Sequence, residues 1–69
     1  MTFGESLKYH RKKKNMSQID LAMACGYVNE FGVDTSQISK YENGMANPTW
    51  YTVKRFADIL GSQFVLDML

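Results

Sequence analysis

Helical periodicity is clear between Thr2 and Asn15. Thr2 and Glu5 have capping-box spacing, in which the threonine oxygen accepts from an early helical N–H and the carboxylate reaches back to the cap. Phe3 and Leu7 then recur at the spacing of one helix face. Asn15 suits the left-handed conformation that often ends a helix. The pattern therefore predicts a first helix over this segment.

A second, shorter helix is predicted from Ser17 to Gly26. Ser17 and Asp20 form a looser capping pair, with aspartate in place of the usual glutamate. Leu21 and Cys25 follow four residues apart on one face, and Gly26 closes the helix. Cys25 therefore takes an inward position, where a free thiol acts as a small apolar residue, and we assign it no reactivity.

The periodicity breaks at residues 27–33, although this segment is apolar. We expect a packed loop or a single extra turn of helix here, because the composition is not that of a disordered linker. Asp34 or Thr35 then caps a third helix, which Gly44 ends. Ile38 marks the inward face of that helix.

Helical spacing returns after the only proline. Pro48 and Thr49 suit the first positions of a helix, and Val53 and Phe56 keep the helical period up to Gly61. This segment predicts the fourth helix.

The segment 62–69 has a different pattern. Phe64, Leu66 and Met68 alternate with other residues that are also largely apolar, which is the period of a strand. We expect a short β-strand paired with a second copy of the chain, because a lone strand leaves its backbone groups unpaired. A short fifth helix is the alternative. Phe64, Leu66 and Met68 are therefore the candidate dimer contacts.

These elements predict an all-α fold, a compact bundle of four to five helices in one domain over residues 1–69. A chain of 69 residues has room for a single core, and 45% hydrophobic with 22% charged residues is ordinary globular composition. A core this small rarely supplies more than about 3–5 kcal/mol, so self-association is a natural source of further stability. No apolar run approaches the roughly 20 residues of a membrane span, and no signal peptide is evident, so we expect a cytoplasmic protein without membrane contact.

Positive charge is concentrated although the formal net charge is only +1. Five of the eight basic residues lie between Lys8 and Lys14. Such a run is commonly a solvated helix face, and it also attracts phosphates.

Residues that would assemble a catalytic or metal site are scarce. His10 is the only histidine and Cys25 the only cysteine, and no carboxylates are paired at a plausible spacing. We therefore expect no enzymatic activity, no metal and no cofactor, and we interpret His10 as a partly buried structural residue.

An ordered set of motifs resembles the helix-turn-helix of the phage-repressor (Cro-like, XRE-type) family. Residues 16–18 look like the opening of its second helix, and residues 21–22 look like the packing point of that helix. Residues 38–44 are similar to the end of its recognition helix, and residues 47–49 are similar to the start of its fourth helix. The resemblance implies a DNA-binding transcriptional regulator whose recognition helix, about residues 35–43, enters the major groove.

A recognition helix needs short polar or amide side chains on its outer face. With Ile38 and Tyr41 turned inward, a rotation of about 100° per residue turns the hydrogen-bonding residues outward. The residues expected to face bases are Thr35, Ser36, Gln37, Ser39 and Lys40.

Phosphate contacts are expected at the helix ends, where free N–H groups and the helix dipole favour anions. The resemblance implies that Gln18 reaches one phosphate and Asn43 another, and that Arg11 pairs with Glu42. The remaining expected phosphate contacts are Ser17, Lys12, Lys13 and Lys14.

Two features depart from the family pattern. Gly26 and Thr35 are separated by about six more residues than the tight turn of a helix-turn-helix allows, so the inserted residues must bulge outward or add a turn of helix. His10 stands where the family has an aliphatic core residue. Trp50 and Tyr51 are also more conspicuous than the family requires, and we interpret them as core or dimer contacts rather than base-stacking residues.

Two functions of different classes fit these observations. The first is a repressor-like regulator that binds a two-fold DNA site as a homodimer. The second is the antitoxin of a toxin–antitoxin pair, which would use the same DNA face and also hold a partner toxin. The small size and the strand-like tail resemble the second group.

Overall fold

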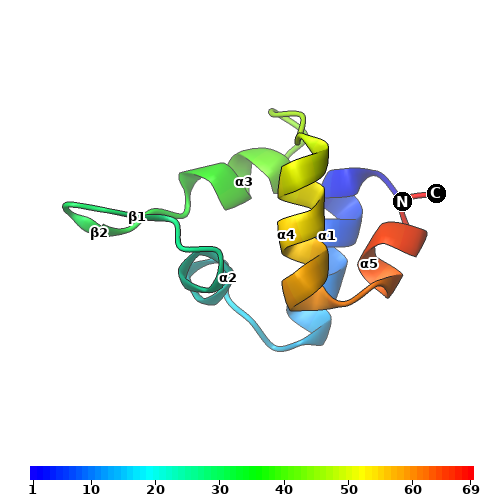
Figure 1. Ribbon diagram of the computed structural model, residues 1–69, viewed down its shortest axis with the longest axis horizontal. Helices are drawn as coiled ribbons and strands as arrows, with labels where there is room; N and C mark the ends of the chain where they lie inside the picture. Colours follow the sequence, from blue (N-terminus) through cyan, green and yellow to red (C-terminus); the bar gives the residue numbers. More distant parts are fainter.

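Five helices and a small hairpin follow one another along the chain in a computed structural model that describes residues 1–69 (Figure 1). The elements are α1 (Phe3–Lys13), α2 (Gln18–Ala24), β1 (Val28–Asn29), β2 (Gly32–Val33), α3 (Ser36–Glu42), α4 (Trp50–Leu60) and α5 (Gln63–Leu66). The predicted all-α bundle of four to five helices is confirmed. None of these helices is long and apolar enough to cross a membrane.

Both predicted capping boxes are present. At the start of α1, Glu5 N donates to Thr2 Oγ1 at 3.2 Å and Thr2 N donates to Glu5 Oε1 at 2.9 Å. At the start of α2, Asp20 N donates to Ser17 Oγ at 3.0 Å and Ser17 N donates to Asp20 Oδ2 at 2.9 Å. These hydrogen bonds, which the charged carboxylates accept, hold the pKa values of Glu5 and Asp20 below their usual range.

One core joins the helices. Phe56 of α4 is fully buried at its centre, with ring centroids 5.9 Å from Tyr41, 6.0 Å from Phe3 and 6.4 Å from Phe64. These tilted and edge-to-face contacts are the preferred geometry of aromatic pairs. The nine buried apolar residues are Leu7, Leu21, Ala22, Cys25, Ile38, Val53, Phe56, Leu60 and Phe64.

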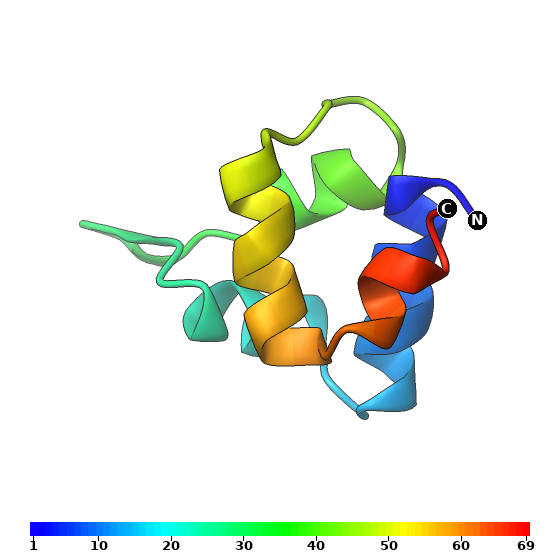
Figure 2. The same ribbon diagram turned by 45° about the vertical axis from the view of Figure 1, so that its right-hand side comes forward.

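The segment 27–33 is a β-hairpin that projects from the helical body between α2 and α3 (Figures 1 and 2). Val28 pairs with Val33 and Asn29 with Gly32 in antiparallel register. Asn29 Oδ1 accepts from Phe31 N at 2.8 Å, and Gly32 takes a φ of 119° that other residues rarely adopt, so the chain reverses within two residues. The expectation of a packed loop or an extra helical turn is wrong, because the segment has its own backbone pairing, whereas the alternative that the inserted residues bulge outward is correct.

The C-terminal segment is helical, so the strand prediction is wrong and the alternative of a fifth helix is correct. Phe64 lies in α5 and Met68 in the turn that follows it, and both pack against the core. Ser6 Oγ donates to Phe64 O at 2.7 Å, and α5 lies along α1 (Figure 2). Phe64 therefore belongs to the chain's own core and offers no surface to a second copy, whereas Leu66 is exposed and Met68 is partly buried.

His10 joins α1 to this segment. Its side chain is almost completely buried, and Nε2 lies 2.6 Å from Asp67 Oδ2. Gln63 Nε2 donates to the other carboxylate oxygen of Asp67 at 2.8 Å. The hydrogen bond from Gln63 and that from His10 together lower the pKa of Asp67. A histidine therefore replaces an aliphatic core residue here because the chain supplies a carboxylate to meet it.

Candidate nucleic-acid interface

The orientation of α3 follows from its buried face. Ile38 is fully buried, and Tyr41 packs edge-on against Phe3 with ring centroids 5.4 Å apart. The opposite face of α3 is consequently turned to solvent. Among the residues expected to face bases, Ser36, Gln37 and Lys40 are exposed, while Thr35 and Ser39 are partly buried. The exposed face of α3 is thus a short row of hydrogen-bonding side chains.

The N-terminus of α3 is occupied by a carboxylate of the chain itself. Asp34 Oδ1 accepts from Ser36 N at 2.9 Å, and hydrogen bonding from the side chain and the backbone of Ser36 lowers the pKa of Asp34. Thr35 stands at the N-cap position, but its side chain makes no capping hydrogen bond, which leaves the hydroxyl free. Since Asp34 already satisfies this helix end and is negative, we do not place a phosphate there.

A buried ion pair ties the end of α3 to α1. Arg11 Nε donates to Glu42 Oε2 at 2.6 Å and Arg11 Nη2 donates to Glu42 Oε1 at 3.0 Å, so the pair is bidentate. The two side chains are only 8% and 3% exposed. Arg11 Nη1 also donates to Met16 O at 2.8 Å, just before α2. The guanidinium is therefore committed inside the domain, where it fixes α3 relative to α1 and α2.

Gln18 belongs to the same cluster. Its Nε2 donates to Glu42 Oε1 at 3.2 Å, so part of the side chain that was expected to reach a phosphate is used within the protein. The backbone N–H groups of Gln18 and Ile19 have no acceptor in the chain, because the Ser17 cap satisfies only the N–H of Asp20. These two N–H groups are the donors that α2 offers to an anion.

Asn43 is exposed at the C-terminal end of α3 and makes only a long hydrogen bond, from Nδ2 to Ser39 Oγ at 3.4 Å. Its amide is therefore available to a ligand. Asn43 and Lys40 together extend the polar surface of α3 beyond Ser36 and Gln37.

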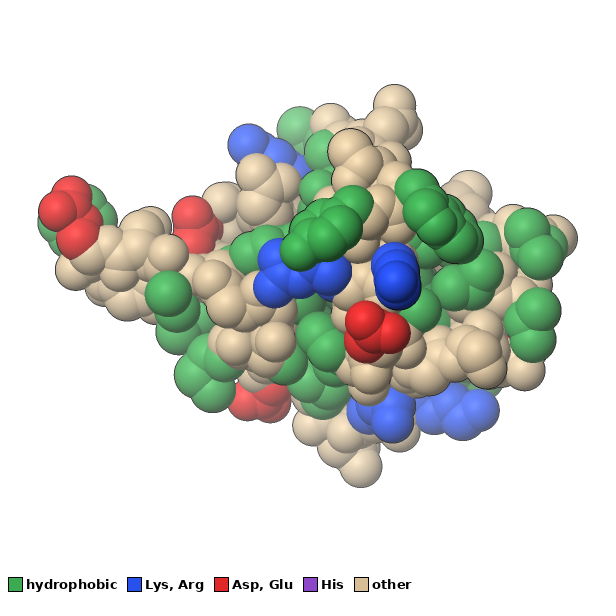
Figure 3. Space-filling model, viewed as in Figure 1, with side chains coloured by type: hydrophobic (Ala, Val, Ile, Leu, Met, Phe, Trp, Pro, Cys, Tyr) green, Lys and Arg blue, Asp and Glu red, His purple; other side chains and the backbone are tan.

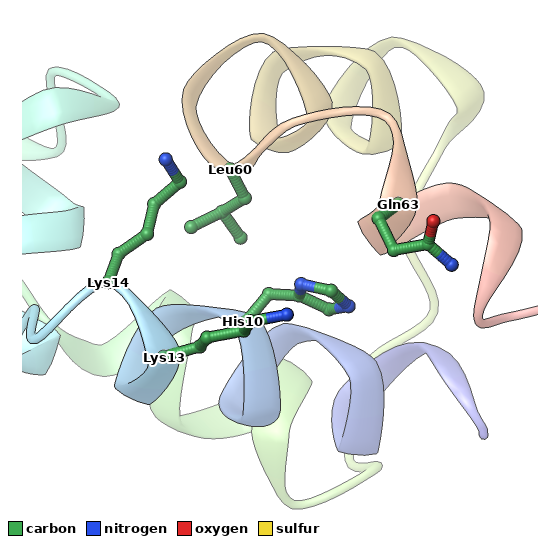
Figure 4. A pocket seen from close by; sticks show the side chains of 5 residues that line it. All are labelled: His10, Lys13, Lys14, Leu60 and Gln63. Atoms are coloured by element: carbon green, nitrogen blue, oxygen red, sulfur yellow. The ribbon is translucent and has the colours of Figure 1, made fainter.

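Two of the three lysines at the end of α1 lie in a cleft that α3 does not line. Lys13 and Lys14 line a cleft with His10, Leu60 and Gln63; Lys13 lies along α1 toward His10, and Lys14 reaches from the end of α1 toward Leu60 (Figure 4). No residue of α2 or α3 lines this cleft. Lys12 is exposed outside it. Lys13 and Lys14 thus contribute positive charge to the domain as a whole rather than to the surface of α3.

Arg55 of α4 is a positioning residue that the sequence analysis did not single out. Its Nη2 donates to the carbonyl oxygen of Cys25 at the end of α2, and its guanidinium lies 5.7 Å from the ring centroid of Tyr27 and 6.0 Å from that of Tyr51. The contact crosses 30 positions of sequence, so no local pattern indicates it. Arg55 anchors the start of the hairpin and the end of α2.

The thiol of Cys25 is buried beside this contact. Burial raises its pKa, which keeps it as an unreactive thiol. No group of three or more histidine, cysteine, aspartate or glutamate side chains is arranged to hold a metal ion.

A sequence model of the helix-turn-helix family matches residues 7–65, which include the whole of α2 and α3. The chain belongs to this family. The phage-repressor type indicated by the sequence motifs is confirmed, and membership makes the chain a DNA-binding transcription regulator. Neither the curated proteins nor the solved structures contain a significant match to it.

Proposed function

We propose that this helix-turn-helix protein is a repressor-like regulator that binds a two-fold-symmetric site on double-stranded DNA as a homodimer. The observation that carries the proposal is the face of α3. Ser36, Gln37 and Lys40 are exposed there, while Ile38 and the Glu42 ion pair hold the helix from behind. Such a face fits the major groove, where side-chain hydrogen bonds distinguish base pairs.

Phosphate contacts around this face would set the register of binding. The free N–H groups of Gln18 and Ile19 suit one phosphate, the amide of Asn43 suits another, and Lys12 adds attraction that is independent of sequence. The buried pair of Arg11 and Glu42 would keep the two ends of this surface at a constant separation.

A homodimer is part of the proposal because α3 is short. A helix of seven residues presents few base-reading side chains, so one half-site gives limited affinity. Two copies joined about 34 Å apart would convert the second contact into an intramolecular one.

In the experiment, duplex sites that the protein binds are first selected from a random DNA pool. The binding constant for a selected site is then measured by titration at several salt concentrations. We expect the logarithm of the binding constant to fall with the logarithm of salt concentration, by about 0.9 per phosphate contacted. A dimer with about six phosphate contacts would lose roughly 10³-fold in affinity between about 50 and 200 mM salt. Affinity that is independent of salt, with no sequence enriched from the pool, would contradict the proposal.

The antitoxin function is a second candidate, and the hairpin favours it. Phe31 at the hairpin tip is 91% exposed, and Val28 is also largely exposed. Exposed apolar side chains on a projecting element are typical of a protein-binding surface. Glu30 lies beside Phe31 and no lysine or arginine lies in residues 27–33, so the hairpin is a poor surface for phosphates.

The substitution Phe31→Ser distinguishes the two functions, because only an antitoxin would lose a bound partner protein. An antitoxin would co-purify with a stoichiometric partner in its native cell, and the substitution would remove that partner while leaving DNA affinity unchanged. A regulator without a toxin would show no such partner, with or without the substitution.

A further inference from the structure

The outer side of α4 is a narrow exposed strip, and the only side chain stacked on one of its rings is Arg55 of the same helix, 6.0 Å from the ring centroid of Tyr51. Val53, Phe56 and Leu60 are buried on the inner side of the helix. The outer side carries Trp50, Tyr51, Lys54 and Asp58, which we call the α4 strip. Trp50 is 70% and Tyr51 69% exposed, so of the two roles expected for them, core or dimer contact, the core role is wrong. Figure 3 shows large apolar side chains at the upper end of α4, directly beside basic and acidic ones.

The two charges of the strip have no partner within the chain. Lys54 and Asp58 are four residues apart, yet the only ion pairs present are His10 with Asp67 and Arg11 with Glu42. A lysine that precedes an acidic residue in a helix is the less favourable order of such a pair. Asp58 also lies in the last turn of α4, where the helix dipole disfavours a negative charge. A cation supplied from outside would therefore stabilise Asp58.

We infer that the α4 strip is the homodimer contact, and that it packs antiparallel against the same strip of a second copy. In a two-fold arrangement centred opposite position 56, residue 54 of each copy faces residue 58 of the other. Both lysines then meet an aspartate, whereas a parallel arrangement would place like charges together. A two-fold contact between identical chains requires a self-complementary surface, and the charges of the strip are self-complementary only when the two helices are antiparallel.

The aromatic residues fit the same arrangement. With the centre at position 56, Trp50 and Tyr51 fall opposite positions 62 and 61 of the second copy. Those positions are Ser62 and Gly61, both exposed and both small enough to leave room for an aromatic ring.

DNA is a poorer occupant of this strip than a second copy. Lys54 and Asp58 of the strip have opposite charges, and the neighbouring Arg55 already donates to the carbonyl oxygen of Cys25, so the strip attracts a polyanion only weakly. Trp50 and Tyr51 of the two copies together bury less area than a standard protein interface. We therefore expect a weak dimer with a Kd on the order of 10–100 μM, and binding to a two-fold DNA site would strengthen it. The inference rests on the proposed dimeric function and names the surface that makes the dimer.

The test measures self-association of the full chain without DNA, so that it is independent of DNA recognition. Sedimentation is followed over a concentration series, together with the fluorescence of Trp50, the only tryptophan. We expect dimer formation accompanied by a blue shift of the emission. Lys54→Asp alone and Asp58→Lys alone each place like charges across the contact, and each should raise the Kd about tenfold or more.

Two combinations separate this contact from a general loss of stability. The double variant Lys54→Asp/Asp58→Lys should recover the homodimer, because both cross-pairs are restored with reversed sign. An equal mixture of the two single variants should form heterodimers, which native mass spectrometry resolves by mass.

A monomer at all concentrations would overturn the inference, as would a dimer that the single variants leave unchanged. If Lys54→Asp abolishes the dimer but still selects one half-site from a DNA pool, the contact and the DNA-binding function both stand. If no variant or wild-type chain selects DNA while the charge pattern of dimerisation holds, only the proposed function fails.

Discussion

Gly4 of α1 lies directly against the backbone of Tyr41 in the last turn of α3. A Cβ atom at position 4 would overlap the carbonyl oxygen of Tyr41 and would stand 3.0 Å from the carbonyl oxygen of Glu42. Because the atoms in its way belong to backbone, they cannot move aside as a flexible side chain would. The absence of a side chain at Gly4 therefore allows α1 and α3 to approach each other this closely.

Replacing Gly4 with alanine should destabilise the protein and displace α3. Alanine is the better helix former, so a purely local effect would stabilise α1. We expect instead a loss of about 1–3 kcal/mol from overpacking, measured by urea unfolding followed by circular dichroism. Lys8→Ala, at an exposed position of the same helix, is the control and should change stability little. A Gly4→Ala protein as stable as wild type would show that α1 and α3 are not in backbone contact.

Removing only one partner of the Arg11–Glu42 ion pair should lower the free energy of unfolding more than replacing both partners. Arg11→Leu leaves the buried carboxylate of Glu42 with only the weaker hydrogen bond from Gln18, so we expect a loss of about 3–5 kcal/mol, enough to unfold much of so small a domain. The double variant Arg11→Leu/Glu42→Leu should recover part of that loss. Thermal unfolding of both single variants and the double variant measures the coupling. Strictly additive effects would mean that the two charges do not interact.

Substitutions on the exposed face of α3 should change which DNA sequence is preferred. Ser36→Ala and Lys40→Ala remove side chains that we expect to face base edges, at a cost of about 1–3 kcal/mol for the preferred sequence. Lys13→Ala removes the same charge as Lys40→Ala from a cleft that α3 does not line, so it should weaken all sequences alike or not at all. Selection of bound sites from a random pool distinguishes these outcomes. A shifted consensus for Lys13→Ala with an unchanged one for Ser36→Ala would contradict our orientation of α3.

Phe64 and Leu66 should behave as core and surface residues respectively. Phe64→Ala removes a fully buried ring that contacts Phe3 and Phe56, and we expect it to destabilise the chain by about 3–5 kcal/mol. Leu66→Ser, at an exposed position of the same short helix, should leave the free energy of unfolding nearly unchanged. Chemical unfolding at one protein concentration compares the two. If the Phe64→Ala chain were as stable as wild type but no longer dimeric, residues 62–69 would again be the candidate dimer contact.

Acid should weaken the attachment of the C-terminal segment. The pKa of Asp67 is lowered in the folded chain by the hydrogen bonds from Gln63 and His10, so its contribution is present above the unfolded-state value of about 3.9 and is lost as the pH falls through the lower folded-state value. Asp67→Asn should be less stable than wild type at neutral pH, and the difference should shrink as the pH falls below about 4. Thermal unfolding across this range measures it. A difference that stays constant with pH would mean that the carboxylate charge plays no part.

Local signals in the sequence were sufficient for the four main helices and for the direction in which α3 faces. Capping at Thr2 and Ser17 depends on residues three positions apart, and the inward position of Ile38 follows from helical rotation alone. The motif resemblance was sufficient for the family. Residues 62–69 were misassigned because Phe64, Leu66 and Met68 satisfy a strand period, while Phe64 and Met68 equally satisfy a helical one.

The sequence by itself determined the features that depend on residues close together along the chain. These are the ends of the helices, the apolar side of each helix, and the order of motifs that marks a helix-turn-helix. The tertiary structure alone decided which long-range partners those helices meet. It placed Asp67 on His10, Arg55 on the carbonyl oxygen of Cys25 and Gly4 against Tyr41. It also left Trp50 exposed, which the sequence had left open between a core and a dimer contact. The physical reason is that packing and charge pairing depend on distances in space, and residues separated by tens of positions acquire those distances only when the whole core has formed.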